Sequence, residues 1–198
     1  MFDELLFSPE PPAGDAAYAG GGACLPQALA WPRDAEGVPL THLLAIPGSW
    51  FCPALKGSGY WVSLFIPYQP GEVAHYRRLR AREGACEAVV MGYLRAAAER
   101  HEAPAPLLER GSIRLLANAD PDDDENLASK LDGVDAWLQS ALSFPAGRRR
   151  LSIYGGDLDQ ALPAHKGILS DGMGYLFLDE DFAARTGAQL GGFFLQLG

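Results

Sequence analysis

Short apolar segments separated by glycine and proline dominate the chain. Residues 41–46 (THLLAI) and 60–66 (YWVSLFI) are rich in β-branched and aromatic residues and are bounded by Gly and Pro, a pattern typical of strands. The same pattern predicts further strands at residues 112–117, 150–154, 174–178 and 193–197. We therefore predict an α+β fold with mainly antiparallel sheets.

The segments between these strands have weaker patterns. Residues 73–82 (VAHYRRLRAR) are expected to form a short helix, and residues 94–101 are helical by propensity. Residues 87–94 (EAVVMGYL) fit either a strand or a helix. The first 19 residues are rich in Pro, Gly and Ala, so we expect an N-terminal arm followed by one domain over residues 20–198.

A similarity between two parts of the chain suggests a duplicated unit. GSGYW at residues 57–61 opens one apolar segment, and GMGYL at 172–176 opens another. Upstream of these, QALAW at 27–31 is matched by QSALSF at 139–144, in the same order. We therefore expect two related halves that share one core. Their expected limits are about residues 20–110 and 111–198.

Composition limits the classes of protein that the chain can form. Hydrophobic residues make up 48% of the 198 positions, which is enough to bury a core and argues against disorder. No apolar stretch approaches the roughly 20 residues that span a bilayer. The acidic start of the chain also lacks the basic region of a signal peptide. We expect a cytoplasmic protein that binds no membrane.

Negative charge is concentrated in one segment. The net charge of −9 disfavours nucleic acid as a partner, because phosphate binding needs lysine and arginine. Residues 120–135 hold seven carboxylates against Lys130 alone, and clustered carboxylates attract cationic partners. The alternative is a solvated loop without a partner. We predict a docking surface for a basic protein formed by Asp120, Asp122, Asp123, Asp124 and Glu125.

The same acidic segment offers a candidate calcium loop. Asp120, Asp122 and Asp124 have the spacing of its first, third and fifth ligands. However, Glu125 and Leu131 replace the glycine and the bidentate glutamate that such a loop needs. The four histidines form no zinc motif, and the cysteines form no CxxC pair. We expect no metal, no cofactor and three reduced thiols, which are Cys24, Cys52 and Cys86.

A proline-bounded loop, IPGSWFCP, carries Trp50 and Phe51. An aromatic pair on a rigid loop can anchor a partner, so both residues are candidate contacts, and burial under the adjacent sheet is the alternative. The other tryptophans are expected in the core. No residue pattern predicts a catalytic group, since a G-x-S-x-G elbow is absent and Cys52 has no adjacent base.

Several segments together resemble the YwqG-like family of bacterial proteins, whose function is unassigned. GGGACLPQALAWP at residues 20–32 is similar to the family's opening Gly-Gly, Leu-Pro and Trp-Pro steps. SKLDGVDAWLQ at 129–139 and LSDGMGYLFLDEDF at 169–182 resemble its two later signatures. Asp132 and Asp135 depart from the family, which usually has Gly and Pro there. The resemblance implies an α+β fold with two related halves and an association with loci for polymorphic toxins and their immunity proteins.

These observations lead to one hypothesis and one alternative. We expect a non-enzymatic immunity protein that neutralises a cognate, basic toxin, such as a secreted nuclease, by direct association. The alternative is an enzyme or a small-ligand-binding protein whose site lies in a cleft between the two halves.

Overall fold

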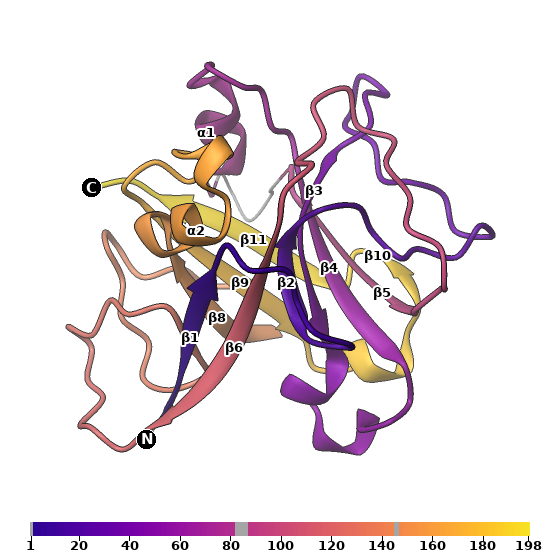
Figure 1. The fold of residues 1–198 in the computed structure, drawn as a ribbon. Helices are drawn as coiled ribbons and strands as arrows, with labels where there is room; N and C mark the ends of the chain where they lie inside the picture. The colour runs from indigo at the N-terminus through magenta and orange to yellow at the C-terminus, as the bar shows by residue number, and fades with distance from the viewer. Residues whose placement is uncertain (1, 82–86, 145–146) are drawn as a thin grey trace.

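The chain folds around a curled antiparallel sheet of 11 strands (Figure 1). A computed structural model describes residues 2–81, 87–144 and 147–198. Within these residues, the order of strands across the sheet is β10-β5-β4-β3-β2-β6-β1-β7-β8-β9-β11. The strands are β1 (Phe2–Ser8), β2 (Ala17–Gly20), β3 (Thr41–Pro47), β4 (Tyr60–Ile66), β5 (Val89–Leu94), β6 (Arg110–Asn118), β7 (Lys130–Leu131), β8 (Gly147–Tyr154), β9 (Met173–Asp179), β10 (Gly187–Ala188) and β11 (Gly191–Gln196).

Helices are short and few in the described residues. Two are α-helical, α1 (Ala74–Leu79) and α2 (Gly155–Ala161). Four single turns of 3-10 helix are η1 (Gly48–Trp50), η2 (Pro53–Leu55), η3 (Pro163–His165) and η4 (Phe182–Ala184).

The apolar segments predicted the main strands correctly. All six predicted strands are confirmed, as β3, β4, β6, β8, β9 and β11. Residues 87–94, which fitted either a strand or a helix, contain the strand β5. The short helix is confirmed as α1. The helical propensity of residues 94–101 is not realised: Leu94 belongs to β5, and the backbone that follows pairs with a distant loop. Ala96 N donates to Cys24 O at 2.8 Å, and Arg100 N donates to Ala23 O at 2.9 Å.

The predicted fold class is wrong. The strands form one continuous, mainly antiparallel sheet with little helix, rather than sheets in two related halves, and no duplicated unit is shown. The glycines that suggested duplication have different structural roles. Gly57 and Gly59 have φ angles of +75° and +72° in a turn, whereas Gly172 and Gly174 lack positive φ and allow close packing. A Cβ atom at Gly174 would lie 2.3 Å from the ring of Phe193.

The segment expected to form an N-terminal arm belongs to the middle of the sheet. It supplies β1, which lies between β6 and β7, and most of β2 (Figure 1). Its sequence, FDELLFS, places two adjacent charged residues among the apolar ones and so lacks the clear pattern of the other strands.

The two edges of the sheet are joined by a single short segment. β10 pairs with β5 at one edge, and β11 pairs with β9 at the other. Only Gln189 and Leu190 separate β10 from β11, and Leu190 N donates to Val90 O at 3.1 Å. The sheet is therefore curled far enough for one segment of chain to connect its opposite edges.

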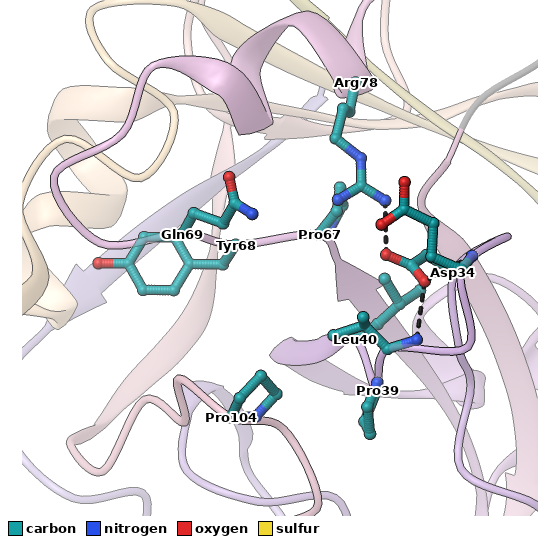
Figure 2. Close-up of a pocket in the computed structure, with 10 residues that line it drawn as sticks. Asp34, Pro39, Leu40, Pro67, Tyr68, Gln69, Arg78 and Pro104 are labelled. Carbon is teal, nitrogen blue, oxygen red and sulfur yellow. Dashed lines mark hydrogen bonds and ion pairs between the residues drawn. The ribbon is translucent and has the colours of Figure 1, made fainter.

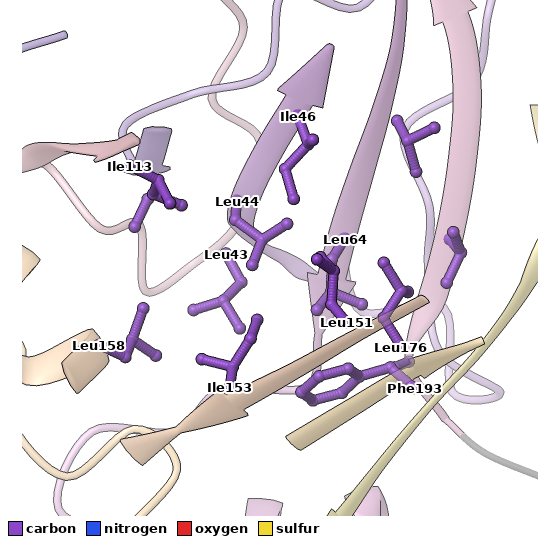
Figure 3. Packing of buried hydrophobic residues seen from close by; sticks show 14 of the residues in the cluster. Leu43, Leu44, Ile46, Leu64, Ile113, Leu151, Ile153, Leu158, Leu176 and Phe193 are labelled. Carbon is purple, nitrogen blue, oxygen red and sulfur yellow. The ribbon is translucent and has the colours of Figure 1, made fainter. Parts of the chain in front are cut away.

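The largest apolar cluster fills the inside of the curl. Leucine and isoleucine side chains of β3 and β4 face those of β8 and β9 across it (Figure 3). The register shift between His42 and Leu44 lets the consecutive residues Leu43 and Leu44 both enter this inner cluster.

Two smaller clusters cover parts of the outer face. One lies over β3, β4 and β5 beneath residues 23–40, and it includes Trp31 and Trp61. The other lies over β9 and β11 beneath residues 137–144. Because these strands are buried on both faces, their sequences are nearly continuous apolar segments.

Candidate functional site

Four of the five acidic residues predicted to bind a partner are exposed. Asp120, Asp123, Asp124 and Glu125 lie on the loop between β6 and β7, which we call the acidic loop (residues 119–128). Short contacts give this loop a defined shape. Asp120 N donates to Asn118 Oδ1 at 2.9 Å, and Glu125 N donates to Asp123 Oδ1 at 3.0 Å.

Asp122 differs from the rest of the acidic loop, because its side chain is only 2% exposed. Its Oδ1 atom lies 2.6 Å from Nζ of Lys130, whose side chain is 1% exposed. Asn126 Nδ2 donates to Oδ1 at 2.9 Å, and Val134 N donates to Oδ2 at 2.6 Å. The prediction that Asp122 contacts a partner is therefore wrong, since this buried carboxylate connects the acidic loop to β7 through its ion pair with Lys130.

The charge state of Asp122 follows from its partners. Burial raises the pKa of this carboxyl, but the hydrogen bonds from Lys130, Val134 and Asn126 outweigh burial and hold the pKa below its usual range. Asp122 is therefore ionised at neutral pH and forms a buried ion pair. The sequence signal for this pair was Lys130, the lone cation within the acidic segment.

The predicted aromatic anchors are not both at the surface. Phe51 is buried in the inner cluster, where its ring meets that of Phe182 edge-on at 6.1 Å between centroids. Its carbonyl oxygen also accepts a hydrogen bond from Arg150 Nη2 at 2.5 Å. Phe51 is thus a core residue, contrary to the prediction. Trp50 is half-buried and packs on the same cluster.

Three buried polar side chains on β3, β4 and β5 form a hydrogen-bonded row across the outer face of these strands. His42 Nε2 lies 3.2 Å from Ser63 Oγ, which lies 2.6 Å from the hydroxyl of Tyr93. On the other side of the ring, Nδ1 lies 3.2 Å from Gly20 O. A neutral imidazole with its proton on Nδ1 satisfies all these contacts. Because Ser63 is fully buried, this Ser-His pair holds strands together and faces no solvent.

Acidification is expected to destabilise the fold through His42. Burial lowers the pKa of His42 from 6.5 to about 4, so the unfolded chain binds a proton more readily than the folded chain. The stabilisation is complete above pH 6.5 and is lost as the pH falls through 4. The expected loss between pH 7 and pH 4 is about 3 kcal/mol. Urea unfolding of the wild type and of His42→Gln at both pH values measures it. An equal pH dependence in both proteins would contradict this assignment.

A hollow of about 100 Å³ lies between α1 and the loop at residues 34–40 (Figure 2). Pro39, Pro67 and Pro104 line it together with Tyr68. Arg78 Nη2 donates to Asp34 Oδ2 at 2.8 Å, and this hydrogen bond lowers the pKa of Asp34. The hollow is too small for a drug-sized ligand, for which sites of about 300–1,000 Å³ are usual. The ion pair between Arg78 and Asp34 holds the loop at residues 34–40 against α1.

Comparison with protein-family models and with curated protein sequences gave no match. The resemblance to the YwqG-like family therefore stays a prediction. In the part of the chain that the structure describes, no three His, Cys, Asp or Glu side chains gather closely enough to hold a metal ion. No helix there has the length and apolar character needed to cross a membrane. Cys24 and Cys52 are free thiols, and Cys86 lies outside the described residues.

Proposed function

We propose that this protein is a cytoplasmic, non-enzymatic binding protein that neutralises a basic toxin, such as a nuclease, by direct association. One observation carries the proposal. The acidic loop presents four exposed carboxylates, and none of the four forms an ion pair within the described residues. Their charges are therefore available to a cationic partner.

Several carboxylates near or beyond the acidic loop are already neutralised by arginine. Asp132 and Asp135 pair with Arg150 and Arg149, and Glu99 pairs with Arg110. Carboxylates without an ion pair also lie on other parts of the described chain, but the acidic loop brings four of them within six consecutive residues. The buried pair of Asp122 and Lys130 holds this loop in one shape before any partner arrives, which lowers the entropic cost of binding.

The direct test is neutralisation in cells. Immunity proteins are encoded beside their toxins, so the product of the neighbouring gene is the partner to examine. Co-expression of the two proteins should protect cells from this product, and the purified proteins should form a stable complex. Absence of both protection and a complex would disprove the proposal.

Removal of three charges from the acidic loop is expected to slow association. The variant Asp123→Asn, Asp124→Asn, Glu125→Gln should bind the toxin with an association rate constant on the order of tenfold lower and with a weaker dependence on salt. Its melting temperature should stay close to that of the wild type, because exposed charges contribute little to stability. Stopped-flow binding at several salt concentrations measures the effect.

A matched variant controls for total charge. Glu36, Glu72 and Asp171 are also exposed, and they lie on other loops. Their conversion to Gln, Gln and Asn removes the same three charges but should change the association rate much less. Equal slowing by both triple variants would show that only the net charge matters and that the acidic loop has no specific part.

A further inference from the structure

The outer face of the sheet is bare where β1 and β6 lie side by side. Elsewhere, residues 23–40 and 137–144 cover it and bury apolar clusters beneath them. Neither cluster includes a residue of β1 or β6. Within the described residues, the middle of these two strands thus shows one face to the inner cluster, and the other face is open to solvent at Arg114 and Leu116 and partly open at Glu4 and Leu6.

Strand alternation determines which side chains occupy this bare face. Leu5 and Ile113 point into the inner cluster, so their neighbours point outward. Glu4 lies opposite Leu116, and Leu6 lies opposite Arg114. We call these four residues the central strip. Leu116 is 50% exposed, and Leu6 is its diagonal neighbour across the two strands, which lets their side chains form one apolar spot.

The central strip and the acidic loop form one continuous surface. β6 ends at Asn118, two residues after Leu116, and the acidic loop follows directly. Asn118 binds both parts, because its Nδ2 atom donates to Glu4 Oε2 at 3.3 Å and its Oδ1 atom accepts from Asp120 N at 2.9 Å. The exposed Leu116 and the half-buried Leu6 are therefore bordered by Glu4 and the carboxylates of the acidic loop, with Arg114 opposite Leu6.

We infer that the central strip is the anchoring part of the toxin-binding surface, an inference that rests on the proposed function. Its occupant is a basic protein that places an apolar side chain over Leu6 and Leu116 and surrounds it with lysine or arginine. Charge complementarity selects this occupant, because Glu4 and the four exposed carboxylates of the acidic loop outnumber Arg114, the cation of the central strip, and none of these five carboxylates forms an ion pair within the described residues. A second copy of this chain would bring like charges together.

The two parts of the surface then control different rate constants. Desolvated apolar anchors determine how long a complex lasts, whereas charges at the rim determine how fast it forms. The dissociation rate constant should therefore depend on Leu116, and the association rate constant should depend on the acidic loop.

The test is surface plasmon resonance with the purified product of the neighbouring gene as the probe. Leu116→Ser and the double variant with Leu6→Ser should dissociate at least about tenfold faster, with little change in the association rate. Leu108 is 76% exposed on the loop before β6, so Leu108→Ser is the matched control and should dissociate as the wild type does. Thermal unfolding should show all variants folded.

Three results would overturn the inference. If the wild type binds the probe and Leu116→Ser dissociates at the same rate, the central strip is not the anchor, although the proposed function stands. If the wild type does not bind the probe, the proposed function and the inference fail together. If light scattering shows a dimer that Leu116→Ser dissociates, the occupant is a second copy of the chain.

Discussion

Replacement of Lys130 by methionine is expected to lower the free energy of unfolding by about 3–5 kcal/mol. The substitution removes the ammonium group 2.6 Å from the buried carboxylate of Asp122. Hydrogen bonds from Asn126 and Val134 remain, but they do not supply a positive charge. An ionised carboxylate without a counter-charge is costly in a site that solvent barely reaches. Urea unfolding at pH 7 measures the loss.

Two further variants separate the loss of the ion pair from the loss of the lysine side chain. The double variant Asp122→Asn, Lys130→Met should be more stable than the single variant, because it leaves no buried charge unpaired. Lys166 is exposed, and Lys166→Met should change the free energy of unfolding by less than about 0.5 kcal/mol. If Lys130→Met cost less than about 1 kcal/mol, the carboxylate of Asp122 would have to be neutral or hydrated.

Truncation of Leu176 to alanine is expected to destabilise the protein by about 2–5 kcal/mol. Leu176 is fully buried at the centre of the inner cluster, between Leu151 on β8 and Phe193 on β11 (Figure 3). These neighbours belong to hydrogen-bonded strands and cannot move inward to fill the space. The variant therefore loses both transfer free energy and packing contacts, and chemical denaturation measures the sum.

Leu116 is the matched control for this truncation. It is the same residue type on β6, but half of its surface is already in contact with water. Leu116→Ala should therefore cost less than about 1 kcal/mol, since little apolar area is lost and no cavity forms. Similar losses in the two variants would mean that the inner cluster repacks around the space left by Leu176.

The sequence predicted strands best where both faces of the sheet are covered. Apart from Ser63 and Asp179, β4 and β9 contain no polar side chain outside tyrosine and tryptophan, because their residues alternate between the inner cluster and an outer one. β1 was missed because the adjacent charged residues Asp3 and Glu4 interrupt its apolar residues. Arg100 illustrates a tertiary contact that local propensity does not encode: its segment is helical by composition, yet its backbone pairs with Ala23.

The candidate site was predicted in part. A charge cluster identifies an exposed loop, because unpaired carboxylates cannot be buried, and this held for Asp120 and Asp123–Glu125. Which carboxylate turns inward depends on a partner on another element, here Lys130 on β7. Whether Phe51 is buried or exposed likewise depends on how the turn η1, which precedes it, packs on the sheet. The central strip had no sequence signal, since β1 was taken for part of an arm.

The position of β1 constrains how the protein can form during synthesis. Phe2 lies opposite Asn118, so β1 has no strand partner until β6, more than a hundred positions later in the chain, has been synthesised. The edges of the sheet are joined later still, by residues 187–196. Such distant pairings make folding slow, and unpaired strands invite aggregation. The nascent chain therefore carries an unfinished sheet, open to capture by chaperones, until those residues clear the exit tunnel.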